Sequence, residues 1–498
     1  MTNEFASLPV AVIGAGPIGL AAAAHLVERG VAVAVFEAGP AVAAHLETFR
    51  HVQLFSAWRF NIDGAARRML EASGWRAPPA DELPTAGAML ERYLRPLAAL
   101  APIAAALRLE HRVASISRDG FDKMKSKGRD DAPFVIRALS SKGPLEFKAW
   151  AVIDASGTWG KPNPLGANGL PAIGEAALAS RIAYGMPDIL GAQRARYAGK
   201  RVLVAGAGHC AAGNLLALAK LAEEAPGTRI VWAIRGDNFA RIFGGGENDK
   251  LAARGALGRR LKRLAESGAL EVHADFRTQA IRATPHGLAV DEQGGDGSQR
   301  RLETIDEIVV AAGSRPDLAL AAELRMGLDP WIESTQMLAP LIDPNVHSCG
   351  TVRPHGHREL AHPEARFYAV GAKSYGRAPN FLLATGHEQV RSVVAALAGD
   401  MAAADDVRLA LPETGVCSTR FDEAASGCCT TDAAEPIAVT TGSRGRETEK
   451  SQGVPATACC AGPPVQRADA CCVADETAKD TGRSGCGCGL KPAAAEGV

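Results

Sequence analysis

The sequence lacks the features that define several protein classes. Its 498 residues carry 55 basic and 55 acidic side chains, and this balance argues against a nucleic-acid-binding protein, which needs a basic face. No apolar run reaches the roughly 18 residues of a transmembrane helix. No basic segment leads into an apolar stretch at the N-terminus, as a secretory signal would require. We therefore expect a chain with no membrane span and no nucleic-acid partner, located in the cytoplasm.

Cysteine is nearly absent from the first 410 residues. Only Cys210 and Cys349 occur there, which is usual in a reducing compartment. The other nine lie between Cys417 and Cys488, in a segment with almost no large apolar residues. Such a segment cannot bury enough apolar surface to offset its chain entropy. Residues 413–498 are therefore predicted to form a disordered, cysteine-rich tail.

A glycine-rich turn lies near the N-terminus, within residues 9–37. A β-branched run is followed by Gly14-Ala15-Gly16-Pro17-Ile18-Gly19, an alanine-rich helical stretch, a second apolar run and Glu37. Gly14 allows the tight turn, Gly16 lets a pyrophosphate approach the backbone, and Gly19 lets the helix pack on its strand. The helix N-terminus favours the pyrophosphate charge, and Glu37 can bind ribose hydroxyls. This unit is predicted to bind FAD.

A second unit of the same kind occupies residues 200–235. Its turn contains Gly206, Gly208 and, at the third glycine position, Ala211, which is a permitted variation. No acid ends its second strand; Arg235 is there instead. An arginine can hold a 2′-phosphate through a bidentate contact, whereas an acid would repel it. We therefore predict NADPH, with a solvated strand-end charge as the alternative role for Arg235.

Three further apolar runs end in small residues and are predicted to be buried strands beside the cofactors. They are AVIDASG (151–157), EIVVAAG (307–313) and RFYAVG (366–371), and a helix is expected over 381–400. Their ends place Ser156, Gly157, Gly313 and Gly371 among the predicted cofactor-binding residues. The fold class is therefore α/β, with an NADPH domain inserted in a Rossmann-like FAD domain. The predicted bounds are 1–195 and 318–412 for the FAD domain, 196–317 for the NADPH domain and 413–498 for the tail.

The segment LFSAWRFNID (54–63) follows the first βαβ unit, where this fold brings a loop over the flavin ring. Trp58 is predicted to stack on the ring. Arg59 and Asn61 are the predicted catalytic residues, which with Asp63 could hydrogen-bond a flavin peroxide or the nicotinamide amide. An equally supported alternative is an ordinary helix start, in which Asp63 caps the helix that follows.

The folded part contains one dense group of histidine and cysteine, at residues 347–362. Cys349 is predicted to contact a soft substrate from a loop over the active site, although a polar surface loop is the simpler alternative. Cys210, in the second glycine turn, is predicted to be structural. The inserted domain has no cysteine pair, and residues 38–60 have no cysteine, so a thiol relay beside the flavin is not expected.

The tail carries repeated neighbouring thiols in a context that is predicted to be reducing. Pairs of thiolates bind thiophilic ions such as trivalent arsenic, mercury, copper(I) or zinc, but the spacing does not match the usual C-x2-C zinc motif. The predicted ligands are Cys428, Cys429, Cys459, Cys460, Cys471, Cys472, Cys486 and Cys488.

Residues 8–417 resemble the flavin-dependent, NADPH-using monooxygenases of the two-dinucleotide-domain flavoprotein superfamily that are encoded near arsenic-resistance genes. Beside the paired glycine turns, the resemblance rests on LFSAWRFNID, LPTAGAMLERYLRPLA (83–98), residues 153–175, HSCGTVRPHG (347–356) and VGAKSYGRAPNFLLATGHEQVRS (370–392). The F-x-G-x-x-x-H fingerprint of many flavin monooxygenases has no matching histidine in residues 169–187.

The resemblance implies oxidation of a soft nucleophile with NADPH and O2, most plausibly of a trivalent arsenical. Two alternatives remain. One is an N- or S-hydroxylating monooxygenase that acts on a small organic molecule. The other is a metal- or metalloid-sequestering flavoprotein that acts mainly through its cysteine-rich tail.

Overall fold

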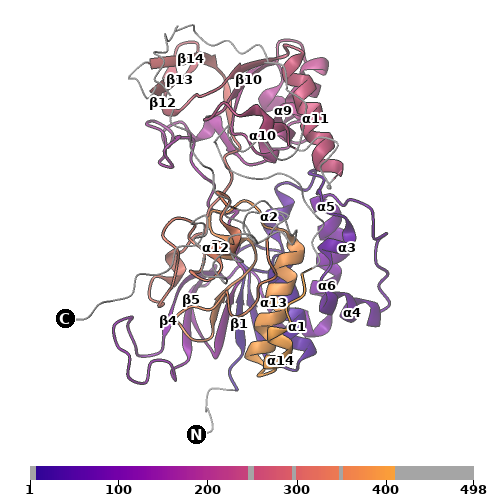
Figure 1. Ribbon diagram of the computed structural model, residues 1–498, viewed down its shortest axis with the longest axis vertical. Coiled ribbons are helices and arrows are strands. Elements are labelled where there is room, and N and C mark those ends of the chain that lie inside the picture. Colours follow the sequence, from indigo (N-terminus) through magenta and orange to yellow (C-terminus); the bar gives the residue numbers. More distant parts are fainter. Residues whose placement is uncertain (1–6, 245–251, 294–298, 347–351, 410–498) are drawn as a thin grey trace, which may run out of the picture. The chain divides into compact units, whose positions relative to one another are not determined.

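The computed structural model describes residues 7–244, 252–293, 299–346 and 352–409 (Figure 1). These residues belong to one compact unit. They form two parallel five-stranded sheets, two antiparallel three-stranded sheets and the helices that join them. The predicted α/β class with two Rossmann-like halves is confirmed. The predicted tail lies outside the described residues.

The first parallel sheet has the strand order β16-β7-β1-β2-β3. The predicted βαβ unit is present: a glycine turn joins β1 to α1, and β2 pairs in parallel with β1. On the other side of β1 lies β7, which in turn pairs with β16. All five carboxyl ends therefore meet at one edge. The bounds are β1 Val10–Ile13, α1 Pro17–Glu28, β2 Val33–Phe36, β3 Leu107–Arg108, β7 Ala151–Asp154 and β16 Phe367–Ala369.

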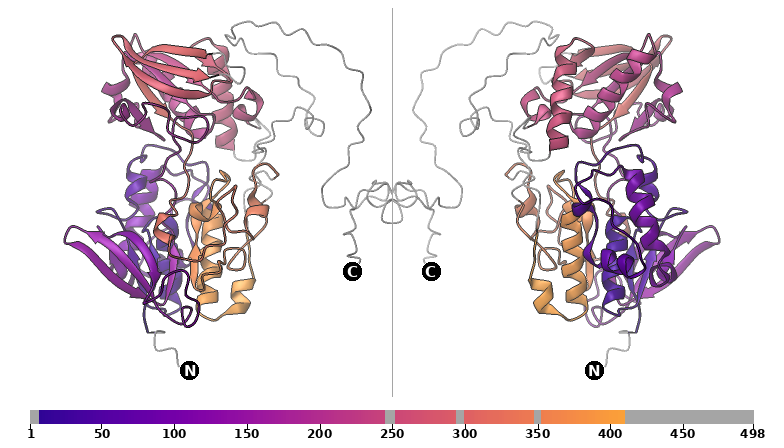
Figure 2. Two further views of the ribbon diagram at one scale, coloured as in Figure 1. Left: turned by 90° about the vertical axis from the view of Figure 1, so that its left-hand side faces the viewer. Right: turned by 90° about the vertical axis from the view of Figure 1, so that its right-hand side faces the viewer.

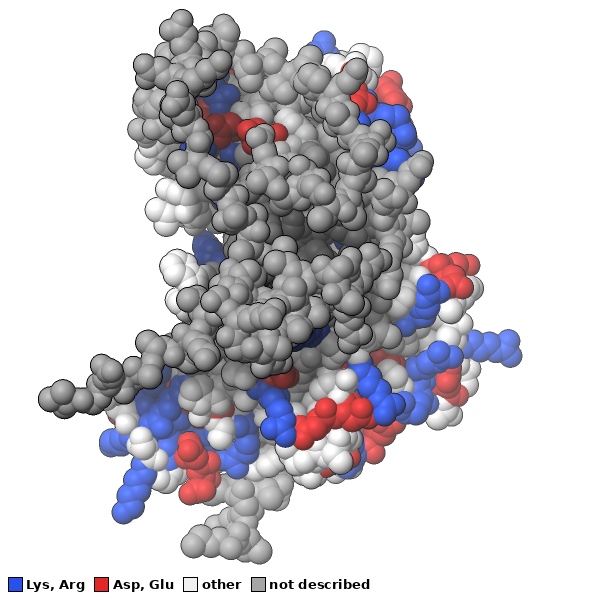
Figure 3. Space-filling view, viewed as in Figure 1, with Lys and Arg blue, Asp and Glu red and all other residues white. Residues whose placement is uncertain are grey.

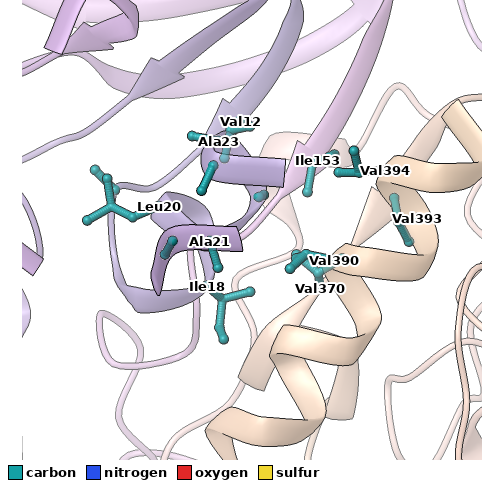
Figure 4. Packing of buried hydrophobic residues seen from close by; sticks show 14 of the residues in the cluster. Val12, Ile18, Leu20, Ala21, Ala23, Ile153, Val370, Val390, Val393 and Val394 are labelled. Carbon is teal, nitrogen blue, oxygen red and sulfur yellow. The ribbon is translucent and has the colours of Figure 1, made fainter. Parts of the chain in front are cut away.

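Alternation along the first sheet sends apolar side chains to two different cores. On one face, Val12 and Ile153 pack with α1 and with the C-terminal helix α13 (Leu383–Leu397), as Figure 4 shows. On the other face, Ala11 and Ile13 pack against the antiparallel sheet β4–β6. Figure 2 shows β4–β6 and α13 on opposite sides of the first sheet. The strands of the antiparallel sheet are β4 Arg112–Arg118, β5 Phe134–Ser140 and β6 Gly143–Ala149.

The second parallel sheet has the order β11-β10-β9-β15-β8. The predicted βαβ unit at 200–235 is present as β9, α9 and β10, and the strand predicted at 307–313 is β15. An antiparallel sheet, β12–β14, precedes β15 in the chain. The bounds are β8 Ile182–Tyr184, β9 Arg201–Ala205, α9 His209–Glu224, β10 Arg229–Ala233, β11 Leu270–His273, β12 Thr278–Thr284, β13 Gly287–Gln293, β14 Gln299–Ile305 and β15 Glu307–Val310.

One predicted domain boundary needs correction. Strand β8 falls within the range 1–195 that the sequence assigned to the FAD domain, yet it pairs in parallel with β15 of the second sheet. Residue Ile173 also forms a bridge with Ala280 of β12. The chain therefore contacts β12 at residue 173 and joins the second parallel sheet at residue 182, and the remaining predicted bounds stay predictions.

Short helices complete the described structure. None of the helices in the described ranges is both long and apolar enough to cross a bilayer. A π-helical turn spans Leu90–Leu94, and 3-10 turns span Ala179–Arg181, Ala319–Ala321 and Gly371–Tyr375. The remaining α-helices are α2 Ala44–Glu47, α3 Trp58–Asn61, α4 Gly64–Ala72, α5 Ala86–Met89, α6 Arg95–Ala99, α7 Ala101–Ala106, α8 Arg194–Tyr197, α10 Phe239–Phe243, α11 Ala252–Glu266, α12 Ala339–Ile342 and α14 Met401–Asp405.

Charges of both signs are interspersed over the described residues on the face shown in Figure 3. Many form surface ion pairs, such as Arg67 with Glu71 and Arg68 with Glu28. Pairs of this kind contribute little stability individually, and they keep the local field weak.

Candidate active site

The first glycine turn is shaped to receive a phosphate group at the start of α1. Gly14 has a φ of +94°, and a Cβ there would lie 2.9 Å from the carbonyl oxygen of Ala155. A Cβ at Gly19 would collide with the Gly14 carbonyl oxygen, so this glycine lets the helix pack on the turn. A Cβ at Gly16, in contrast, would meet no atom within 4 Å. The approach to the helix N-terminus is therefore open at Gly16.

The N-terminus of α1 has backbone donors without side-chain acceptors. Gly16 is its N-cap residue, no side chain caps the helix, and its first turn contains no acid. The first N–H groups of a helix lack intrahelical partners and favour an anion. These residues fit the pyrophosphate of a dinucleotide, as the sequence predicted.

Glu37 lies at the end of β2, next to this turn, and is buried. One carboxylate oxygen accepts a hydrogen bond from the Ala15 N–H at 2.9 Å, and the other accepts one from the Gly39 N–H at 2.8 Å. The carboxylate thus fixes the glycine turn. Each oxygen can accept a second hydrogen bond, so the predicted ribose contact remains compatible with this geometry.

The ends of β7 and β16 meet beside the same turn. Gly371 has a φ of +70°, and a Cβ there would lie 3.2 Å from Ile18 at the start of α1. Ser156 follows β7, and its hydroxyl donates to Asp154 at 2.6 Å. Gly157, with a φ of +69°, has open space where a Cβ would be. The predicted cofactor-binding residues Ser156, Gly157 and Gly371 are therefore gathered at the carboxyl edge of the first sheet.

A buried ion pair, which the sequence analysis did not identify, holds this edge together. The ammonium group of Lys373 lies 2.5 Å from a carboxylate oxygen of Asp154, and both side chains are almost fully buried. Lys373 also donates to the Ser156 hydroxyl at 2.9 Å. Breaking a buried pair by removing one partner leaves an uncompensated charge. This contact therefore fixes the loop after β7 against the turn after β16.

The second glycine turn repeats the geometry of the first. Gly206 has a φ of +138°, and a Cβ there would collide with the Ala311 carbonyl oxygen, whereas a Cβ at Gly208 would meet nothing within 4 Å. Helix α9 has no side-chain cap and no acid in its first turn. Ala211, at the third glycine position, is buried against the second sheet. A second dinucleotide therefore fits here.

A cavity of about 880 Å³ lies beside this second turn, and we call it cavity 1. Gly206, Gly208, Arg235 and Gly313 line it, as does Arg254 of α11, which the sequence analysis did not select. Arg235 is exposed and donates to the Ala167 carbonyl oxygen at 3.0 Å. The two arginines are the cations that the described residues offer to a phosphate at this end of cavity 1.

Glu175 shapes the loop that forms another wall of cavity 1. Its carboxylate accepts hydrogen bonds from the Leu165 N–H at 2.9 Å, the Ala172 N–H at 2.5 Å and the Tyr184 hydroxyl at 2.6 Å. Burial, followed by the contact with Glu175, raises the pKa of Tyr184, so the hydroxyl remains a donor. This glutamate fixes the loop, whose residues 163–167 and 169 line cavity 1.

Two of the residues predicted from LFSAWRFNID do not line cavity 1. Trp58 is only 1% exposed and packs in the core of the first sheet, with the Arg92 guanidinium 5.6 Å from the centre of its ring. A residue that stacks on a bound ring has to face the binding space, so the predicted stacking is wrong. Arg59 is half exposed and forms an ion pair with Asp81. It lines a separate cavity of about 510 Å³ rather than cavity 1, and its catalytic role stays a prediction.

Asn61 does reach cavity 1. Its amide nitrogen donates to the carbonyl oxygens of Ser56 at 2.6 Å and Ala57 at 3.1 Å. Both amide hydrogens therefore hold the loop. The amide oxygen is then the atom that can bind a ligand, as an acceptor, and the catalytic role of Asn61 stays a prediction.

Asp63 has the helix-capping role that the sequence offered as the alternative. Its carboxylate accepts a hydrogen bond from the Ala66 N–H at 2.9 Å and lies 3.0 Å from the His25 ring nitrogen Nε2. Burial by itself would raise the pKa of Asp63, but the charge and hydrogen bond of His25 outweigh it and lower the pKa to about 2. His387 lies nearby, and burial lowers its pKa. These three residues line the separate cavity of about 510 Å³ and not cavity 1.

The predicted thiol sites remain predictions. Cys349 and the tail ligands Cys428, Cys429, Cys459, Cys460, Cys471, Cys472, Cys486 and Cys488 lie outside the described residues. Burial raises the pKa of Cys210, the free cysteine among the described residues, which disfavours its thiolate form. Within the described ranges, no group of His, Cys, Asp or Glu is arranged to hold a metal ion.

Comparison with known proteins identifies the class of protein. Residues 11–348 match the family described as pyridine nucleotide-disulphide oxidoreductase. This match covers more than half of the chain, so the protein belongs to that family of oxidoreductases. No curated protein matches the sequence.

Solved structures with a similar fold include enzymes named as reductases and enzymes named as monooxygenases or hydroxylases. The bacillithiol disulfide reductase of Bacillus cereus is 17% identical, with a TM-score of 0.57 over 79% of this chain and 99% of its own. An ornithine N-hydroxylase of Kutzneria sp. 744, solved with reduced FAD and NADP⁺, is 16% identical, with a TM-score of 0.52 over 79% of this chain and 98% of its own. A cadaverine monooxygenase of Erwinia amylovora bound to FAD is 13% identical, with a TM-score of 0.54 over 86% of this chain and 99% of its own. The predicted cofactor classes, a flavin and a nicotinamide dinucleotide, are those of this group of enzymes.

Proposed function

We propose that the protein is an FAD-dependent monooxygenase that uses NADPH and O2 to oxygenate a soft nucleophile, with a trivalent arsenical as the candidate substrate. One observation carries the proposal: two glycine turns, each open at a helix N-terminus, occur in one chain. Cavity 1, beside the second turn, has no cysteine among its described lining residues. In the overall reaction, NADPH supplies two electrons, one oxygen atom enters the substrate and the other leaves as water.

The chain's own groups account for cofactor binding. The N-terminus of α1 binds the FAD pyrophosphate, and Glu37 orders the turn and accepts from the ribose. The N-terminus of α9 binds the NADPH pyrophosphate, with Arg235 and Arg254 beside the 2′-phosphate. Bound flavin would supply the redox chemistry between NADPH and O2. The protein's part is to orient the two cofactors and the substrate.

The family name refers to disulphide oxidoreductases, so a disulfide is the alternative to oxygen as the acceptor of the flavin's electrons. A disulfide reductase that relays electrons through the protein needs reactive cysteines beside its flavin. The described lining of cavity 1 provides none, and Cys210, which is partly buried, does not line it. These observations support oxygen as the electron acceptor.

The test is direct. We expect the purified protein to be yellow, with a flavin spectrum, and to oxidise NADPH faster when methylarsenite is present. Oxygen consumption should equal NADPH consumption, and methylarsenate should form without an equal amount of hydrogen peroxide. Anaerobic NADPH oxidation coupled to reduction of a low-molecular-weight disulfide would instead establish a reductase.

Two other functions have specific support. The TM-scores above 0.5 with ornithine and cadaverine monooxygenases favour an N- or S-hydroxylase that acts on a small organic molecule. The cluster of cysteines after residue 410 favours a protein that sequesters thiophilic ions. If trivalent arsenicals stimulate NADPH oxidation, the arsenical monooxygenase is favoured over the N- or S-hydroxylase. Ion binding without substrate-stimulated NADPH oxidation would support the second.

A further inference from the structure

The buried ion pair of Asp154 and Lys373 lies on one side of the first glycine turn. Asp154 is the last residue of β7, and Lys373 lies in the 3-10 turn that follows β16. Only 1% of Asp154 and 3% of Lys373 is exposed. The cost of desolvating two charges can exceed their attraction, so stability alone is a weak explanation for a buried pair. The position of the pair relative to the cofactor offers a better one.

The strand order assigns the flavin half of FAD to this side of the turn. The turn follows β1, which lies between β2 and β7 in the sheet. A dinucleotide whose pyrophosphate lies at the turn therefore extends toward β2 on one side and toward β7 and β16 on the other. Glu37, at the end of β2, is placed for the ribose of the adenosine half. The flavin half is left with the edge where Asp154 and Lys373 lie.

Ser156 connects the pair to the exposed surface of this edge. Its hydroxyl donates to Asp154 at 2.6 Å and accepts from Lys373 at 2.9 Å. Ser156 is exposed, unlike its two partners, and Gly157 beside it has open space where a Cβ would be. The ion pair is therefore one hydrogen bond away from an exposed group on the side assigned to the flavin.

The pair is electrically neutral, and its titratable neighbours add little charge. His362 is close enough to interact with the Asp154 carboxylate, but burial lowers the pKa of His362 to about 4, so its ring is neutral at pH 7. Asp317 is close enough to interact with Lys373, but it is exposed and pairs with Lys161 at 3.5 Å. Removing one member of the buried pair would therefore leave a net charge that water screens poorly.

We propose that Asp154 and Lys373 set the reduction potential of the bound flavin by keeping this edge of its site electrically neutral. Reduction adds negative charge to the flavin ring, so an unpaired cation nearby favours the reduced form and an unpaired anion favours the oxidised form. The two are positioning residues rather than catalytic ones, because they act through their field and through Ser156. The inference rests on the FAD site of the function proposed above and not on which acceptor takes the electrons.

The test measures the midpoint potential of the flavin in the full-length holoenzyme by anaerobic spectroelectrochemistry. Asp154→Asn leaves the ammonium without its carboxylate and should raise the potential. Lys373→Met leaves the carboxylate without its ammonium and should lower the potential. The double variant is neutral again and should return close to the wild type. Burial disfavours an unpaired charge, so the shift in Asp154→Asn should be larger at about pH 6 than at about pH 8, and the shift in Lys373→Met should be larger at about pH 8.

Asp63→Asn is the matched control. Asp63 is also a buried carboxylate, and its partner His25 lies near the C-terminal end of α1, whereas the pyrophosphate site is at the N-terminus of that helix. This variant should lose stability and keep the wild-type potential. If the two single variants shift the potential in the same direction, or no more than Asp63→Asn does, the pair is only structural and the inference is overturned.

If a single variant is purified without FAD, the double variant decides. FAD bound to the double variant with the wild-type potential supports neutrality as the requirement, and a double variant that also lacks FAD overturns it. The titration uses no NADPH, oxygen or arsenical, so it is independent of the proposed reaction. Opposite shifts in a protein that proves to be a disulfide reductase would overturn that reaction and support this inference, whereas unshifted potentials in an arsenical monooxygenase would do the reverse.

Discussion

Substituting Gly16 or Gly208 by leucine should remove one cofactor and leave the other in place. Both glycines have extended backbones, with φ of −76° and −95°, which any residue adopts. A Cβ at either position meets no atom within 4 Å, so the fold accepts the side chain. The loss of a glycine N-cap costs roughly 1 kcal/mol of stability. The leucine would, however, fill the space that a pyrophosphate needs.

The expected loss of affinity follows from the bonds that the phosphate would forfeit. Two backbone N–H bonds to a charged oxygen are worth about 1.5–3 kcal/mol each, so binding should weaken by roughly 10²- to 10⁴-fold. Gly16→Leu should be purified without yellow colour, and Gly208→Leu should keep its flavin while its KM for NADPH rises. Circular dichroism should match the wild type closely, whereas the melting temperature of Gly16→Leu should fall because bound FAD no longer stabilises the folded state. A Gly16→Leu protein with one FAD per chain would refute the assignment of the first turn, and a normal KM in Gly208→Leu would refute the second.

Three further outcomes are expected. Arg235→Glu should raise the KM for NADPH roughly 10- to 150-fold and that for NADH much less, because a charge-assisted bond to the 2′-phosphate is lost; equal effects on both would contradict that role. Asp63→Asn should lower the free energy of unfolding by about 2 kcal/mol at neutral pH. The folded pKa of Asp63, about 2, lies below its usual 3.8. The difference in unfolding free energy between wild type and Asp63→Asn should therefore be present above about pH 4 and vanish as the pH falls through 2. If chemical denaturation gives the same difference at every pH, the negative charge of Asp63 is not its cause. Truncation after Val416 should preserve flavin binding and NADPH oxidation but lower the number of arsenite ions bound per chain; loss of flavin would show that the tail is structural.

The sequence predicted the fold well because its signals are local. Apolar runs of strand length, glycines at fixed offsets and an amphipathic stretch over 381–400 each depend on neighbouring residues only. The boundary at residue 195 was misplaced because β8 is a three-residue strand with one fully buried side chain. Its place in the second sheet depends on pairing with β15, more than 120 residues away, and no local pattern encodes that partner.

The site was predicted where backbone geometry decides it and missed where distant side chains meet. Gly14 and Gly206, the first glycines of the two turns, are identifiable because glycine readily adopts a positive φ and allows a backbone approach that a Cβ would block. Lys373 and Asp154, in contrast, are separated by more than 200 residues, and although both lie in stretches that the sequence singled out, no local pattern indicates that they pair.

The segment around Trp58 shows why four neighbouring residues could not share one function. Successive residues on a helix point about 100° apart, so on α3 residues 58 and 61 share a face and residue 59 points elsewhere. Trp58 and Asn61 are both buried, and Arg59 is half exposed with Asp81 as its partner. Helical spacing alone therefore places Arg59 and Asn61 on different faces of α3. A short helix here was one of the two interpretations of the sequence. Which face turns toward cavity 1 is decided by α4, because its N-cap Asp63 is fixed by His25 of α1.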